Sequence, residues 1–212
     1  MFAVTIDQKR SRSGSDLVPE LLDAFADLSV VLDFERTAGD ELQGLLEDPV
    51  AVVAAVLAAM RQGGWSIGVG IGEVRLPLPA STRAAAGPAF IAARAALNNA
   101  KRSGSNATVS IVAAEQNRQP WADQAEGVLG LLGQLVLQRT EAEWRVVDAF
   151  AESPQATMSE VAATLGISHQ AVSQTLSRTS WRQQQAAEPA AATLLTLVEQ
   201  GTLTVADEPT QN

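Results

Sequence analysis

The chain has 212 residues, of which 46% are apolar, enough to bury a substantial core without metal or disulfide support. It contains no cysteine, which excludes disulfides, thiolate-bound zinc and cysteine nucleophiles. The formal net charge of −9 argues against a general nucleic-acid coat, because affinity for phosphates comes mainly from lysine and arginine, so any contact with DNA must be local.

The N-terminus lacks the basic start and the longer apolar stretch of a signal peptide. The longest apolar run, residues 50–60, is far shorter than the roughly 20 residues that a membrane span needs. The sequence therefore predicts a cytoplasmic protein without a membrane partner.

The first 116 residues alternate strand and helix patterns. The expected strands are residues 2–6, 29–35, 41–46, 65–74 and 107–113, and the expected helices are 16–28, 48–61 and 88–101. Residues 37–40 form the tight connection of a β-hairpin. This βαββαβ order with an extra helix and strand favours an antiparallel sheet covered on one side by helices, as in a ferredoxin-like palm.

Three glycines mark one face of the expected strand 65–74. Gly68, Gly70 and Gly72 lie on the same side, because side chains alternate along a strand. Strand glycines allow a close approach by another backbone or a ligand. We therefore expect either a packed helix or a ligand against this face.

Strand patterns end after residue 116. Residues 117–120 are expected to be a linker, and helices are expected at 121–138, 141–151, 158–165, 170–177 and 190–200. The sequence thus predicts an α+β protein, with a sheet domain at 1–116 and an all-α domain at 117–212. The last helix has an apolar stripe that is a candidate for a dimer interface or for packing on residues 128–137. The stripe consists of Leu194, Leu195, Leu197 and Val198.

Residues 157–181 have the pattern of a helix-turn-helix. Gly166 supplies the turn, Ser168 caps the second helix, and Ile167 is expected to fill the core. The expected inward residues are Val161, Ala162, Leu165, Val172 and Leu176. The opposite face carries polar groups that can bind base edges or phosphates in a major groove. The predicted DNA-binding residues are Ser168, His169, Gln170, Ser173, Gln174, Ser177, Arg178 and Arg182.

This stretch resembles the helix-turn-helix of bacterial regulators in its Leu-Gly-Ile-Ser turn and the Val172-Ser173 pair that follows. The resemblance implies DNA as a partner. One helix-turn-helix reads only a few base pairs, so we also expect a homodimer. The alternative is a polar helical hairpin that packs two domains together.

Two carboxylates suggest a second site. Asp7 ends the first strand and Asp40 lies at the hairpin, and a palm-like sheet places these strands side by side. Carboxylates in such a position could hold Mg²⁺ with a nucleoside triphosphate. Alternatively, Asp40 and Glu41 are turn residues, and Asp7 pairs with Lys9 or Arg10.

The hairpin Gly39-Asp40-Glu41 resembles the Gly-Gly-Asp-Glu-Phe hairpin of diguanylate cyclases, within a sheet similar to that of class III nucleotide cyclases. The resemblance implies a cyclase-like palm at 1–116, with Asp7 and Asp40 as metal ligands. It also implies nucleotide-binding roles for Gly39, Asp40, Glu41 and Arg94. Phe90 stands where the cyclase helix carries an asparagine, so the resemblance implies ligand binding without turnover.

Over nearly its full length, the order of Asp7, the hairpin, the glycine strand and the helix-turn-helix resembles the SatD family, often grouped with MarR-like regulators. That resemblance implies a regulator. Our main expectation is a DNA-binding transcription regulator with a sensing or dimerisation domain. One alternative is a metal-dependent nucleotide cyclase or nucleotidyltransferase with an accessory helix-turn-helix, and another is a non-enzymatic protein-interaction module.

Overall fold

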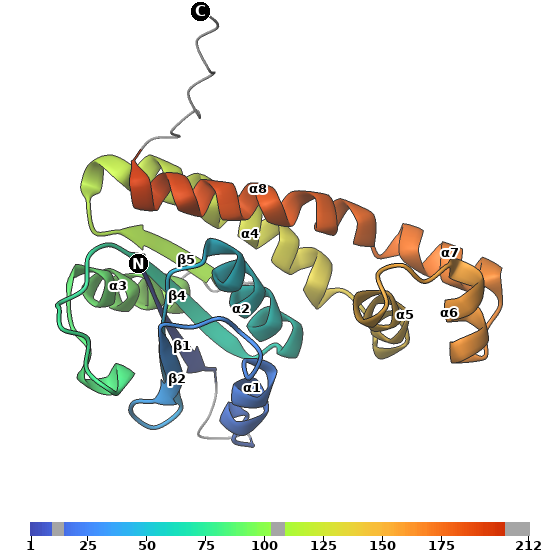
Figure 1. Cartoon of the computed structure of the whole chain (residues 1–212), viewed down its shortest axis with the longest axis horizontal. Coiled ribbons are helices and arrows are strands. Elements are labelled where there is room, and N and C mark those ends of the chain that lie inside the picture. Colours follow the sequence, from blue (N-terminus) through green and yellow to red (C-terminus); the bar gives the residue numbers. More distant parts are fainter. Residues whose placement is uncertain (10–14, 103–108, 202–212) are drawn as a thin grey trace, which may run out of the picture.

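A computed structural model describes residues 1–9, 15–102 and 109–201 of the chain. It places a five-stranded sheet between helices and carries three further helices, α5 to α7, on an arm beside the sheet (Figure 1). The strands are β1 Phe2–Gln8, β2 Leu32–Arg36, β3 Glu41–Leu46, β4 Trp65–Ile71 and β5 Val109–Ala113. The helices are α1 Val18–Ala24, α2 Pro49–Gln62, α3 Pro88–Arg102, α4 Gln119–Leu137, α5 Glu141–Glu152, α6 Met158–Leu165, α7 His169–Arg178 and α8 Trp181–Gln200. Among the described residues, no helix is long and apolar enough to cross a membrane.

The sheet has the strand order β2-β3-β1-β4-β5, with β1 at its centre. β1 runs antiparallel to β3 and β4, and the predicted β2–β3 hairpin is present. The α+β class is therefore confirmed, with one correction to the sheet. β5 is parallel to β4, because α3 crosses between them and returns the chain in the same direction. The predicted strand residues 107 and 108 lie outside the described part.

Helices cover both faces of the sheet, whereas we expected helices on one face only. α3 packs on the glycine face, where a Cβ atom on Gly70 would lie 2.1 Å from the backbone of Ala89 and Ala93. A Cβ atom on Gly68 would lie 2.3 Å from the backbone nitrogen of Leu97. The glycines therefore admit a packed helix rather than a ligand.

Side chains of α4 cover the outer edge of β5. The Glu126 carboxylate accepts hydrogen bonds from the Ile111 backbone nitrogen at 2.8 Å and from the Ser110 hydroxyl at 3.0 Å. Gln119 accepts from the Ala113 nitrogen and donates to the Ile111 carbonyl. This edge is thereby closed to further strand pairing. The prediction of a linker at 117–120 was wrong, because Gln119 and Pro120 already belong to α4, where proline is tolerated in the first turn.

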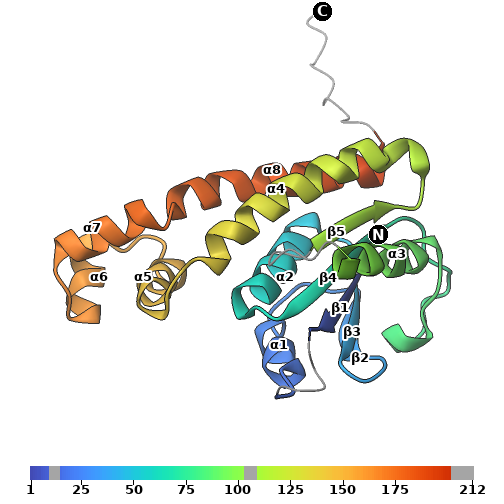
Figure 2. The same cartoon turned by 180° about the vertical axis from the view of Figure 1, so that it is seen from behind.

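The described residues form three apolar clusters. One of them packs α3 against the sheet around Ala3, Phe90 and Ala93, and the other two are joined by α8. The larger core lies between the sheet, α2, α4 and the second half of α8, and includes Leu129 and Leu195. A smaller core joins α5, α6 and α7. α4 and α8 lie side by side over the sheet (Figure 2). The predicted packing of the last helix on 128–137 is therefore confirmed, since Leu195 and Val198 lie in the same core as Leu129.

Stacked arginines and tryptophans join the two cores. The Arg61 guanidinium at the end of α2 lies 3.9 Å from the ring centroid of Trp144 in α5, and it binds both carboxylate oxygens of Asp148 at 2.7 Å. Arg139 is buried beside Trp144 and Trp181 and donates to the Thr179 carbonyl at 2.9 Å. Cation–π stacking and hydrogen bonds thus connect α2 to the base of the helical arm.

Candidate nucleic-acid interface

Local capping signals define α6 and α7. Thr157 and Glu160 form a reciprocal capping box at the start of α6. Gly166 ends α6 with a φ of 66°, a left-handed conformation that favours glycine. The Ser168 hydroxyl then accepts from the Ala171 nitrogen at 3.1 Å and starts α7. These residues fix the predicted helix-turn-helix geometry.

The inward face is as predicted at four positions. Val161, Ala162, Val172 and Leu176 are buried, with Val146 of α5, in the smaller core. Leu165 is half-buried at its margin. The prediction for Ile167 was wrong, because its side chain is 39% exposed in the turn between the helices instead of filling the core.

The outward face of α7 carries polar groups without internal partners. All eight residues predicted to bind DNA are exposed. In the described part of the chain, the side chains of His169, Gln170, Ser173, Gln174 and Ser177 make no hydrogen bond or ion pair. Ser168 is occupied by its cap, and Arg178 pairs with Glu143 of α5 at 2.7 Å through its Nε. The exposed face therefore offers free donors and acceptors, whereas its contact with DNA stays a prediction.

A hollow of about 320 Å³ gathers three of the predicted residues from two helices. Ser173 and Ser177 come from α7, and Arg182 comes from the first turn of α8. Met158, Leu176 and Gln183 complete the lining. Two hydroxyls and one guanidinium in a small exposed hollow can bind a phosphate oxygen by charge-assisted hydrogen bonds.

Comparison with known families agrees with this geometry. The model of the MarR family matches residues 137–179. These residues form a MarR-like helix-turn-helix region. No curated protein and no solved structure matches the chain significantly. The predicted helix-turn-helix and its MarR-like character are thereby confirmed, whereas the resemblances to the SatD family and to cyclases gain no support from these comparisons.

Sequence reasoning missed Glu143, which lies inside the MarR-like region. Its carboxylate accepts from the Thr140 nitrogen at 2.7 Å and from the Thr140 hydroxyl at 2.9 Å, in a second capping box. These hydrogen bonds, with a smaller contribution from Arg178, lower the pKa of Glu143. The Thr-x-x-Glu spacing was a visible signal for the cap, but its contact with α7 spans 35 residues.

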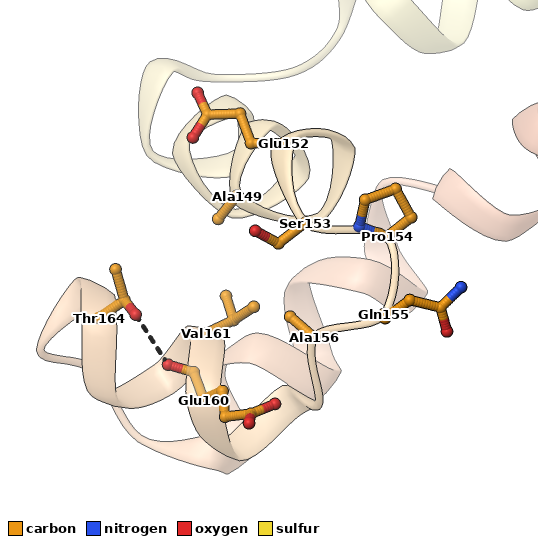
Figure 3. A pocket seen from close by; sticks show the side chains of 9 residues that line it. All are labelled: Ala149, Glu152, Ser153, Pro154, Gln155, Ala156, Glu160, Val161 and Thr164. Carbon is orange, nitrogen blue, oxygen red and sulfur yellow. Dashed lines mark hydrogen bonds between the residues drawn. The ribbon is translucent and has the colours of Figure 1, made fainter.

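A larger hollow lies on another side of the MarR-like region, between the end of α5 and α6 (Figure 3). Its volume is about 630 Å³, and small side chains such as Ala149, Ala156 and Val161 line it. Its charged groups are the carboxylates of Glu152 and Glu160. Carboxylates repel phosphates, so the charges of this hollow are unfavourable for a nucleic-acid backbone.

The predicted nucleotide site lies at the hairpin end of the sheet. Asp7 and Glu41 are direct partners in the β1–β3 register, so these two strands are neighbours as predicted. Gly39 occupies the hairpin turn with a φ of 60°, and Asp40 follows it without a side-chain partner among the described residues. The structure therefore brings Asp7, Asp40 and Glu41 to one end of the sheet.

The charges at this end are largely paired. Asp7 binds the Lys101 ammonium of α3 at 2.7 Å, a partner that sequence reasoning missed. The Arg94 guanidinium donates hydrogen bonds to both carboxylate oxygens of Glu41. The Glu41 side chain is buried and also accepts a hydrogen bond from the Thr37 hydroxyl at 2.9 Å. Arg10, one of the predicted partners of Asp7, lies outside the described residues. The described part of the chain contains no group of three side chains that could hold a metal ion.

Proposed function

We propose that the chain is a DNA-binding transcription regulator that places α7 in the major groove, with the sheet domain serving in sensing or dimerisation. The observation that carries the proposal is the exposed polar face of α7, within a region that matches the MarR family. Side chains such as Gln170 and Gln174 offer both donors and acceptors, the chemistry that reads base edges in a major groove.

The hollow beside α7 supports a separate role in binding the DNA backbone. Arg182 supplies a positive charge there, and the Ser173 and Ser177 hydroxyls supply hydrogen bonds. A phosphate in this hollow would fix the register of α7 in the groove without reading sequence. The acidic net charge of −9 implies weak nonspecific binding with a shallow dependence on salt, on the order of −0.9 in log–log slope for each phosphate contact.

The test measures binding to genomic DNA fragments over a range of salt concentrations. Gln170→Ala and Gln174→Ala should relax sequence preference, and Arg182→Ala should weaken binding evenly across sequences. Gln155→Ala, in the acidic hollow between α5 and α6, is the matched control and should bind as the wild type does. Wild-type binding by all three interface variants would contradict the proposal. An absence of any DNA binding would favour the protein-interaction alternative.

We propose in addition that the regulator acts as a homodimer, because pairing two copies of α7 doubles the number of base pairs read. The apolar stripe of α8 is largely occupied by its packing on α4, so the interface lies on another surface. Sedimentation at tens of micromolar protein should show a dimer, and a monomer at that concentration would contradict this proposal.

The site for Mg²⁺ with a nucleotide is a separate proposal. The described side chains do not fit a magnesium–nucleotide complex in their present arrangement, because the Asp7 carboxylate is paired with Lys101 and the Glu41 carboxylate is paired with Arg94. An ion would have to displace Lys101. If the site forms, Mg²⁺ with a nucleoside triphosphate should raise the unfolding temperature, Asp40→Asn should abolish the rise, and Lys101→Met should enlarge it. No shift with any nucleotide would contradict this proposal.

A further inference from the structure

Glu143 connects the start of α5 to the end of the recognition helix α7. Its side chain is buried, and its Oε2 accepts two hydrogen bonds from Thr140, which fix the carboxylate in place. The other oxygen, Oε1, faces α7 and accepts from the Nε of Arg178 at 2.7 Å. The Glu143 carboxylate therefore completes the cap of α5 and also forms an ion pair with Arg178, an arginine of the predicted DNA-binding surface.

The ion pair with Glu143 leaves most of the Arg178 side chain exposed to solvent. The contact uses Nε, and the Arg178 side chain remains 71% exposed. A guanidinium carries five N–H donors in a planar fork, so a single bond at Nε leaves the two terminal amino groups available. Those terminal groups are the ones that bind a phosphate or a carboxylate in bidentate fashion.

We propose that Glu143 is a positioning residue for DNA binding: it holds Arg178 through Nε so that the terminal amino groups meet a backbone phosphate beside α7. The inference rests on the proposed function and deepens it. An unheld arginine loses side-chain freedom when it binds, and a preset side chain avoids that entropic cost. Glu143 is itself fixed by Thr140, so it can supply the preset orientation.

A competing role for Glu143 predicts the opposite change in DNA affinity when its charge is removed. If Glu143 only neutralises Arg178, its charge weakens the attraction for DNA, and its removal strengthens binding. If it positions Arg178, its removal costs a phosphate contact. Glu143→Gln separates the two roles. An amide oxygen that keeps the two hydrogen bonds from Thr140 turns the amide NH₂ toward Arg178, and that group cannot accept a hydrogen bond from its Nε.

The experiment follows the binding of the full chain to a short random-sequence DNA duplex as a function of salt, because phosphate contacts do not depend on sequence. Arg178→Ala should reduce the log–log salt slope by about 0.9, the value for one phosphate contact. Glu143→Gln should reduce it by a similar amount, and the double variant should show no further loss, since both changes remove the same contact.

Thr140→Ala is the matched control. It removes both hydrogen bonds of the Thr140 hydroxyl but keeps the bond from the Thr140 backbone nitrogen that still fixes Glu143, and it leaves the Glu143–Arg178 pair. It should therefore lower thermal stability without changing the salt slope. Stronger binding by Glu143→Gln, or an unchanged slope in that variant or in Arg178→Ala, would overturn the positioning role while leaving the proposed function intact. If the wild type binds no duplex at all, the proposed function and the inference both fail.

Discussion

The hairpin end of the sheet and the outer face of α7 both carry polar side chains, but they use them differently. In the sheet unit, Asp7 binds Lys101 and Glu41 binds Arg94, so the charges bind each other. On α7, side chains such as Gln170 and Gln174 have no partner within the described chain. Polar groups that are already paired stabilise the fold, whereas unpaired exposed groups are available to another molecule. The outer face of α7 is therefore better suited than the hairpin end of the sheet to contact another molecule.

The largest expected effect tests how tightly the sheet unit is packed. Gly70→Ala should destabilise the protein by on the order of 3 kcal/mol or more, because the new Cβ atom meets the α3 backbone, which cannot move aside without shifting the helix. Gly127→Ala is the control: Gly127 is exposed within α4 and has nothing near its Cβ position, so alanine there should stabilise by about 0.5–1 kcal/mol. Urea unfolding measures both, and a tolerated Gly70→Ala would contradict the packing.

A smaller effect tests whether the helical arm has a core of its own. Val172→Ala should destabilise the arm by about 1.5–3 kcal/mol, because Val172 is fully buried between α5, α6 and α7. Hydrogen exchange should speed up in α6 and α7 and remain unchanged in β1 and β4. Val50→Ala, at an exposed valine of α2, should alter neither. Equal acceleration across the sheet would show that the two cores unfold as one.

The junction between the two cores should contribute less. Arg61 and Asp148 form a two-bond ion pair, but their side chains are 43% and 36% exposed, and solvent screens such pairs. A double-mutant cycle of Arg61→Ala and Asp148→Ala should give a coupling of about 0.5–1 kcal/mol. The same cycle with Arg75, an exposed arginine of the loop after β4 with no ion pair in the described chain, should give none. A coupling well above this range would indicate that the units are rigidly locked.

The smallest expected effect concerns acid. The hydrogen bonds from the Thr157 backbone and hydroxyl lower the pKa of Glu160 from its ordinary value of 4.5. Its stabilising contribution is therefore complete above the unfolded pKa and is lost as the pH falls through the lower folded pKa. Glu160→Gln should make the exchange of the Val172 amide less dependent on pH below 4.5. Glu152→Gln, whose carboxylate accepts no hydrogen bond in the described chain, should leave that dependence unchanged.

What the sequence predicted well depends on neighbours in the chain. The cap at Ser168, the turn at Gly166 and the apolar run of β1 act over a few residues, so their patterns are visible in the sequence. The hairpin and the close approach at Gly68 and Gly70 were also predictable, because glycine has a distinct conformational and steric meaning.

What the sequence did not predict depends on distant residues. Lys101 reaches Asp7 only because α3 returns across the sheet, and Glu143 reaches Arg178 only because α5 packs on α7. The parallel direction of β5 follows from the same crossover. Ile167 is exposed in the turn between α6 and α7, and hydrophobic patterning alone does not distinguish an exposed turn residue from a buried one. The linker prediction at 117–120 failed because Gln119 forms part of the edge cover of β5.

The path of α8 has a consequence for the order in which the chain matures on the ribosome. The chain leaves the sheet unit at the end of α4, forms the helical arm, and rejoins the larger core only in the second half of α8. The arm is therefore an insertion within the sheet unit. During synthesis, the apolar surfaces of α2 and α4 stay exposed until residues such as Leu195 and Val198 have been translated. The apolar faces of α5, α6 and α7 can pack on one another before that point. The sheet unit is thus translated first, but its apolar core is completed last. A chain truncated before α8 would leave apolar surface of the sheet unit, rather than of the arm, exposed to aggregation.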